Sequence, residues 1–311
     1  MVTGVAFDDP LTTIFTRELQ RILFPNNDFY KSSTLIATGA DLNAATFEIP
    51  QELAEPSIVV NPSAFPLTHE ELVDGNNVVS MDLFATQPTR LGDREAAEVS
   101  FDKRASILDR HNKVINQRVS ATCINKWSPL AADAANLIAT TGASVATGLA
   151  GATGTRKAIT KDDFIKAAEV LDRMEMTGQR YALIGATMYS QLLGISDFVD
   201  YNKTGNQSAL LQGQVGELLG IKIYKRSTGG IYSSTNAPKA VGAAVAATDN
   251  EAALFWDSSA VGRVEGAVKV YINAAQAQYL GDIMNAAVRF GTKAMRNDKK
   301  GIVALIQAAG A

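Results

Sequence analysis

The sequence predicts an α+β fold in which the helices come early and most of the strands come late. Residues 102–127 repeat apolar side chains at helical spacing, which indicates one long helix. The second half of the chain holds short segments in which apolar and polar side chains alternate, as they do in half-buried strands. Because helical and strand segments do not alternate regularly along the chain, a doubly wound parallel sheet is not expected.

The composition is that of a globular protein. The chain has 311 residues, of which 46% are hydrophobic and 20% charged, so it can bury a substantial core. Its formal net charge of −3 argues against a protein whose main task is to bind nucleic acid through a basic surface. No signal-peptide pattern opens the chain, and no window approaches the ~18 uninterrupted apolar residues of a membrane span. Neither secretion nor membrane insertion is expected.

The first hundred residues predict extended structure. Prolines interrupt the short apolar runs before residue 63, and we expect an extended arm that ends in one or two strands. Residues 64–100 contain strand-like pieces around Gly75, Asn76 and Asn77, which are residue types typical of a turn. This part is predicted to form a long two-stranded excursion.

The middle of the chain predicts two helices separated by a loop. The long helix is about 37 Å long at 1.5 Å per residue, and Pro129 ends it. Residues 131–155 are rich in Ala, Gly and Thr, a composition that favours a flexible loop or tip. A second helix follows, because Thr160 and Asp163 have the spacing of a capping box and apolar residues recur after them.

The remaining elements follow in quick succession. RYALIG is predicted as a buried strand, ATMYSQLLGI as a short helix ended by Gly194, and GIKIYKRS as a half-buried strand. Four more segments, ALFWDSS, VKVYIN, AAVRFGTKAM and GIVALIQ, carry strand signals. Between the last two, NDKKG is interpreted as a hairpin turn.

No catalytic, cofactor-binding or metal-binding residue is predicted. His69 and His111 are the only histidines, and with Cys123 alone they cannot form a conventional zinc site. Both histidines are interpreted as structural, His111 as a residue on the surface of the long helix and His69 as part of the extended loop. Cys123 is interpreted as a buried apolar thiol of the long helix, in a chain made in a reducing cytosol. No G-x-S-x-G elbow is present to place a nucleophilic serine.

Three further groups of residues were weighed as sites and are interpreted as structural. The glycine series lack the motifs that bind phosphate or dinucleotides, the acidic residues fit a helix start and its solvated face, and the basic cluster fits subunit contacts better than DNA. The glycines are Gly148, Gly151 and Gly154, and Gly213, Gly216 and Gly220; the acids are Asp162, Asp163 and Glu169; the basic residues are Arg289, Lys293, Arg296, Lys299 and Lys300.

The order of segments resembles that of the Hong Kong 97-type major capsid proteins of tailed double-stranded-DNA phages. Residues 180–227 carry a strand, a short helix, a variable Gly/Asn loop, a turn with spaced glycines and a strand, which is the order in the central part of that family. Residues 83–111 resemble the end of the family's extended loop and the start of its spine helix, and residues 286–305 resemble its C-terminal strands. The likeness covers most of residues 60–311.

The resemblance implies a structural protein and not an enzyme. It implies self-assembly as hexamers and pentamers into an icosahedral head that encloses DNA without sequence-specific binding, in the virion after assembly in the host cytoplasm. Scaffolding and portal proteins, and a decoration protein, are the implied partners, with no membrane and no cofactor. The implied parts are an N-terminal arm with the first peripheral strands (1–63), an extended loop (64–101), a spine helix (102–135), an axial domain (136–262) and peripheral C-terminal strands (263–311).

Two alternatives stay open. Encapsulin, the shell protein of a bacterial nanocompartment, shares this fold, and cargo protein in purified particles would favour it. An α+β enzyme without a recognisable motif is the other, and a monomer with one deep pocket would favour it.

Charge adds a hypothesis about subunit contacts. Residues 41–102 hold twelve Asp or Glu and two Arg, whereas residues 103–126 hold six Lys or Arg and one Asp. We hypothesise that the acidic loop of one subunit lies over the basic helix of the next; the alternative is that both faces are solvated. Some relatives lock their shells with an isopeptide bond from a lysine of the extended loop. No lysine occurs between Ser32 and Asp102, so a noncovalent shell is expected.

Overall fold

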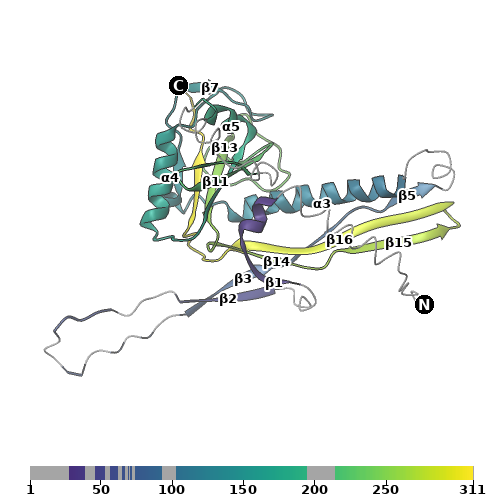
Figure 1. Cartoon of the computed structure of the whole chain (residues 1–311), viewed down its shortest axis with the longest axis horizontal. Coiled ribbons are helices and arrows are strands. Elements are labelled where there is room, and N and C mark those ends of the chain that lie inside the picture. Colours follow the sequence, from purple (N-terminus) through teal and green to yellow (C-terminus); the bar gives the residue numbers. More distant parts are fainter. Residues whose placement is uncertain are drawn as a thin grey trace.

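The structure is a computed structural model that describes residues 28–38, 46–52, 57–61, 65–66, 69, 71, 74–92, 103–194 and 214–310. Figure 1 shows an elongated molecule with a thick end, formed by one sheet and its helices, and a thin end, formed by a long helix lying on long strands. A two-stranded ribbon leaves the body in another direction. The mixed architecture confirms the predicted α+β class.

The long helix, α3 (Lys103–Trp127), forms where the sequence predicts it. Its buried apolar face, which includes Leu108, Ile115 and Val119, packs on the long strand β16 (Gly281–Ala294). Val114 is the exception, because the apolar pattern includes it but its side chain is 59% exposed. The helix therefore carries one apolar residue outside its packed face.

A six-stranded sheet lies under α3 among the described residues. Its main path runs β1 (Thr34–Thr38), β14 (Val261–Glu265), β16 and β15 (Lys269–Gln276), and the short strands β4 (Asp82–Ala85) and β5 (Thr89–Gly92) pair with β16 in succession. At 14 residues, β16 is long enough to bind β4 and β5 along one edge.

A seven-stranded sheet forms the thick end. Helices α4 (Lys161–Arg173) and α5 (Ala186–Leu192) contact it, and their core cluster includes Phe164, Leu171 and Phe255. The order of its strands is β10 (Gln214–Leu218), β11 (Ile221–Arg226), β9 (Arg180–Gly185), β13 (Asn250–Asp257), β17 (Ile302–Ile306) and β6 (Leu137–Ala139), with β12 (Gly230–Tyr232) paired to β13.

An aromatic cluster joins the two sheets. Trp127 of α3 and Trp256 of β13 have ring centroids 5.3 Å apart, and Phe29 packs edge-on against both. Phe29 belongs to a short 3-10 helix, η1 (Asp28–Ser32), whose Ser32 hydroxyl accepts a hydrogen bond of 3.0 Å from Trp256 Nε1. The segment before β1 therefore connects the end of α3 to the seven-stranded sheet.

The protruding ribbon differs from the predicted excursion. It consists of β2 (Thr46–Glu52) and β3 (Asp74–Ser80), which are antiparallel. Gly75, Asn76 and Asn77 lie inside β3, so the predicted turn at these residues is wrong. The reason is tertiary: the buried Asn77 side chain donates hydrogen bonds to the carbonyls of Ala294 and Met295, which fixes extended backbone at this point.

Residues 131–155 do not form the predicted flexible loop. They contain a 3-10 turn, η3 (Ala134–Asn136), the sheet strand β6 and most of a hairpin made by β7 (Ser144–Ala146) and β8 (Thr155–Lys157). The glycines serve close packing, because a Cβ at Gly148 would lie 2.3 Å from the Thr187 hydroxyl and one at Gly142 would lie 2.5 Å from the Ala158 carbonyl oxygen. Composition alone does not separate such a segment from a flexible one.

Residues 297–301 do not form the predicted hairpin turn. They connect β16 to β17, which belong to different sheets. All five residues of β17 are buried, and the strand lies between β13 and β6. A continuously buried apolar strand needs cover on both faces, and β17 has it because Ile302, Ala304 and Ile306 pack in one core cluster while Val303 and Leu305 pack in another.

Candidate subunit-interface groove

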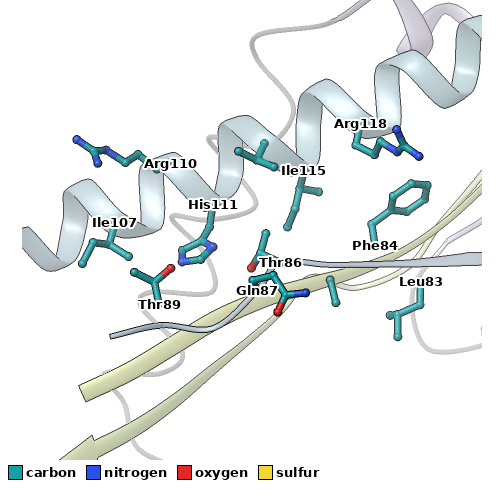
Figure 2. Close-up of a pocket in the computed structure, with 12 residues that line it drawn as sticks. Leu83, Phe84, Thr86, Gln87, Thr89, Ile107, Arg110, His111, Ile115 and Arg118 are labelled. Atoms are coloured by element: carbon teal, nitrogen blue, oxygen red, sulfur yellow. The ribbon is translucent and has the colours of Figure 1, made fainter. Parts of the chain in front are cut away.

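A groove runs between α3 and the β4–β5 segment (Figure 2). It has a volume of about 650 Å³ and apolar walls, with Leu83 and Phe84 on the strand side and Ile107, Val114 and Ile115 on the helix side. Figure 2 shows the side chains of Arg110 and Arg118 on the helix that borders it. A groove with apolar walls and cationic side chains beside it suits a protein segment with apolar and acidic residues.

His111 places one unused polar group at the groove. The residue is 7% exposed and lines the cavity, and its Nε2 has no hydrogen-bond partner. Burial lowers the pKa of this imidazole, so it is neutral at pH 7. A neutral ring nitrogen at an apolar surface can bond to one peptide group of an incoming chain.

Several basic residues of α3 make ion pairs or hydrogen bonds within the subunit. Lys113 Nζ lies 2.8 Å from Asp109 Oδ2, and Lys126 Nζ lies 2.7 Å from Asp82 Oδ2, so part of the opposite charge pairs within one subunit. Arg118 donates to the Val241 carbonyl oxygen at 3.2 Å. Among the described residues Arg110 is exposed and makes no ion pair.

The acidic residues that were considered as candidate catalytic residues have structural roles. Asp163 forms the predicted capping box with Thr160, and Glu169 pairs with Arg173 one turn further along α4. Asp162 lies exposed in the first turn of α4. No group of three His, Cys, Asp or Glu residues that could hold a metal ion occurs in the described part of the chain.

The structure agrees with the expectation for Cys123 but not with the one for His111. Cys123 is fully buried in α3, as predicted, and burial raises the pKa of its thiol. His69 is exposed, whereas His111 is buried against the groove and does not lie on the helix surface as expected. The helical pattern around His111 carries no signal for this burial, which depends on β4 and β5 packing alongside.

The spaced glycines act in turns and packing. Gly220 lies at φ +76° beside Leu219 at φ +53°, and the pair forms the turn between β10 and β11. Two positive φ angles in a two-residue hairpin loop favour glycine. Gly216 lies within β10, and Gly213 lies outside the described residues. Gly151 and Gly154 also have positive φ angles, in the loop that leads to β8.

The basic residues near the C-terminus are dispersed and mostly engaged. Lys293 donates to the Val78 carbonyl oxygen and Arg296 pairs with Asp298 at 2.9 Å. Lys299 Nζ donates to the carbonyl oxygens of Lys126 and Ser128 at the end of α3, and burial lowers its pKa to about 8. These contacts fix the link to β17 onto the helix end.

Glu251 is a buried carboxyl that the sequence analysis missed. It is 2% exposed and accepts a hydrogen bond of 2.9 Å from the Gly229 amide and another from the Thr187 side chain. Burial raises its pKa. The carboxyl therefore has a structural contact, which holds β13 against the turn at residues 228–230.

Glu251→Gln is expected to stabilise the protein at neutral pH. A raised carboxyl pKa means that the folded state binds more protons than the unfolded state, so stability falls as pH rises above the ordinary glutamate value of about 4.3. The amide keeps an acceptor for Gly229 without a buried charge. Thermal unfolding from pH 4 to 8 should show the variant gaining on the wild type as pH rises. A constant difference across that range would contradict the assignment.

No helix in the described residues is both long and apolar enough to cross a membrane.

Comparisons with known proteins place the fold. No protein-family model and no curated protein matches the sequence. Among solved structures, the capsid of Ralstonia phage GP4 aligns with a TM-score of 0.63 and 13% identity, over 100% of this chain and 99% of that one. The capsid of cyanophage P-SCSP1u aligns with a TM-score of 0.58 and 19% identity, over 90% and 87% of the two chains. The capsid of a native GTA particle aligns with a TM-score of 0.56 and 13% identity, over 99% and 93%.

The alignments extend over nearly the whole chain, although few residues are identical. Agreement at this level of identity establishes shared architecture, which is the architecture that the order of segments predicted. The chain has the α+β fold of the Hong Kong 97-type major capsid proteins of tailed phages.

Proposed function

We propose that the chain is the major capsid protein of a tailed phage. Its copies assemble as hexamers and pentamers into an icosahedral head that encloses double-stranded DNA. The observation that carries the proposal is the match over 100% of this chain and 99% of the Ralstonia phage GP4 capsid chain. An enzyme that shared only a core sheet would not be expected to match the ribbon, the long helix and both sheets together.

The shape of the chain supports a structural role. The ribbon and the long β15–β16 pair extend away from the thick end of the molecule (Figure 1). Large apolar side chains are exposed on the β15–β16 extension, such as Tyr271 at 54% and Leu280, just before β16, at 71%. Exposed apolar groups on protruding elements indicate surfaces that other copies cover.

The parts of the subunit follow from the two sheets. We assign the six-stranded sheet with α3 to the peripheral domain and the seven-stranded sheet with α4 and α5 to the axial domain. β17 is then part of the axial domain, although it comes after the peripheral strands in the sequence. We propose that the ribbon of β2 and β3 belongs to the extended loop, for which the sequence analysis expected residues 64–101.

The remaining partners belong to the same proposal. Scaffolding and portal proteins would act during assembly in the host cytoplasm, and a decoration protein would bind the finished shell in the virion. The role is structural and not catalytic. The net charge of −3 is compatible with DNA held inside a closed shell without sequence-specific contacts.

Electron microscopy of the purified chain tests the proposal. The chain is expressed with and without a candidate scaffolding protein, and its size is followed by chromatography. Closed shells, or rings of six and five subunits, are the expected result. A 33.1 kDa monomer that never assembles would contradict the proposal and favour an enzyme. Purified shells that contain a cargo protein would favour encapsulin.

A further inference from the structure

A smaller cavity lies where the C-terminal half of α3 meets residues 238–243. It has a volume of about 250 Å³, and Arg226, the last residue of β11, lines it. Thr228 and Gly242 also line it and are exposed, so the cavity opens to solvent. Because sites for drug-sized ligands have volumes of about 300–1,000 Å³, this cavity suits a small ion with its waters.

The charge in this cavity is positive. Among the described residues its lining includes Arg226 and Lys239 but no Asp or Glu. Lys239 Nζ lies 2.6 Å from Asp249 Oδ2, so its charge is neutralised within the subunit. Arg226 makes no ion pair with any residue that the structure describes. The cavity therefore holds one positive charge without a counter-charge.

The guanidinium of Arg226 has more donors than partners. It carries N–H groups on Nε, Nη1 and Nη2, and in the described part of the chain Nη2 alone has a partner, the Gln117 carbonyl oxygen at 3.3 Å. Nε and Nη1 are not sealed from solvent, so they are accessible at the cavity. Burial lowers the pKa of Arg226, yet the guanidinium remains charged at pH 7. A half-buried charge of this kind favours an anion beside it.

Arg156 shows how the same chain satisfies an arginine that has a structural role. It is 5% exposed and also makes no ion pair among the described residues. Its Nε donates to Asn250 Oδ1 at 2.6 Å, and Nη1 and Nη2 each donate to two carbonyl oxygens. Every nitrogen of that guanidinium therefore has an acceptor. Arg226 lacks such acceptors, so contacts within the subunit do not explain its position.

We propose that this cavity binds one phosphate group, with Arg226 as its principal contact. A guanidinium presents parallel N–H groups that can bond two oxygens of a phosphate at once. The Thr228 hydroxyl lines the same cavity, makes no hydrogen bond in the described part of the chain, and can donate to a third oxygen. The phosphate is free inorganic phosphate or a phosphate of the DNA backbone. The site belongs to the folded subunit and does not depend on the proposed shell function.

Isothermal titration calorimetry of the purified full chain with inorganic phosphate tests the site, at an ionic strength held constant with sodium chloride. We expect saturable binding. Arg226→Gln should weaken it by at least about tenfold, because charge-assisted hydrogen bonds to the phosphate are lost. The matched control is Arg173→Gln, which removes the same charge from an exposed position of α4 and should bind phosphate as the wild type does. Acetate, with fewer acceptor oxygens, should bind at least about tenfold more weakly than phosphate.

Ala240→Glu provides a second variant that leaves Arg226 in place. Ala240 is exposed and lines the cavity, so the substitution adds a carboxylate at the mouth without disturbing the core. This carboxylate should pair with the guanidinium and abolish phosphate binding. Ala240→Gln has nearly the same shape and no charge, so it should retain binding.

The source of the phosphate is identified with a labelled single-stranded oligonucleotide, whose binding is followed by fluorescence anisotropy. If the DNA backbone occupies the site, Arg226→Gln should weaken oligonucleotide binding more than Arg173→Gln does. If the site takes only free phosphate, the two variants should bind the oligonucleotide alike. Either result keeps the site and names its ligand.

The calorimetric outcomes are separate from those of the shell experiment, because the titration needs no assembly. Phosphate binding that is lost in both Arg226→Gln and Ala240→Glu would support the site. No binding by the wild type, equal affinity in Arg226→Gln, or equal affinity for acetate would overturn it. A chain that binds phosphate but never assembles would overturn only the shell proposal, and shells whose subunits bind no phosphate would overturn only the site.

Discussion

Phe29→Ala is expected to lower the free energy of unfolding by about 3–5 kcal/mol, the range for removing a buried aromatic ring. Phe29 is 2% exposed, and its ring lies edge-on to Tyr30, Trp127 and Trp256 with centroid distances of 6.0, 5.9 and 6.2 Å. The truncated side chain would leave a cavity among rings that are held from several elements. Because domains are stable by about 5–15 kcal/mol in total, the loss is a large part of that stability.

The position of Phe29 explains why the effect spreads beyond one element. Its neighbours come from α3 and from β13, and Tyr30 beside it packs on Phe290 of β16 with centroids 5.8 Å apart. One short 3-10 helix therefore contacts the long helix and both sheets. A cavity here loosens the junction between the sheets, so unfolding of the whole chain should be affected and not only that of residues 28–33.

Urea unfolding followed by tryptophan fluorescence measures the loss, because Trp127 and Trp256 report on the same junction. Phe65→Ala is the matched control, since Phe65 is 74% exposed and its truncation should change the free energy of unfolding by less than about 0.5 kcal/mol. Equal losses for the two phenylalanines would contradict the role assigned to η1. A loss confined to Phe29→Ala would support it.

Local signals in the sequence predicted the elements that depend on neighbouring residues. The helical spacing of residues 102–127 and the capping pair Thr160 and Asp163 both specify backbone within a few turns, and the structure confirms both helices. The order of strand, short helix and strand in residues 180–227 is also confirmed. Each of these patterns depends only on residues that are close in the sequence, so it can be recognised without knowing the tertiary structure.

Pairing between distant segments could not be predicted in this way. β17 pairs in parallel with β6, where Ala304 lies opposite Leu137, and no pattern near either residue specifies the other. The turn residues Gly75 and Asn76 became part of a strand because β2 pairs with β3. Turn propensity is a weak preference, and a ladder of backbone hydrogen bonds overrides it.

The groove was also beyond sequence reasoning. Val114 shares the apolar periodicity of α3 with Ile115, yet one is exposed at the groove and the other is 3% exposed in the core. Periodicity predicts which side of a helix is apolar. It does not predict how far the sheet extends along that side, and so which of the apolar residues are buried. Only the pairing of β4 and β5 with β16 leaves a gap beside Val114 and covers His111.

Asp163→Ala is expected to cost about 3 kcal/mol of unfolding free energy. The carboxylate is fully buried and accepts hydrogen bonds from the Thr160 amide at 2.9 Å, the Thr141 hydroxyl at 2.7 Å and the Thr141 amide at 3.2 Å. The capping box accounts for about 1 kcal/mol, and the donors of Thr141 left without a partner account for the rest. The sequence predicted the contact between Asp163 and Thr160 but not the contacts between Asp163 and Thr141.

The neighbouring residue provides the control. Asp162 lies in the same turn of α4, exposed, so Asp162→Ala should lose less than about 1 kcal/mol through the helix dipole alone. Asp163→Asn keeps one acceptor oxygen and should fall between the two alanine variants. Urea unfolding measures the global loss, and hydrogen exchange at Thr141 and Thr160 measures the local one.

The exchange data decide what the carboxylate does. If Asp163 only caps α4, its loss should speed exchange at Thr160 and leave Thr141 unchanged. If it also fastens the strand segment after β6 to the helix, both amides should exchange faster in Asp163→Ala and neither should in Asp162→Ala. The second result is expected, because the Thr141 hydroxyl and amide both reach the same side chain. A single buried carboxylate then holds the start of α4 against the edge of the seven-stranded sheet.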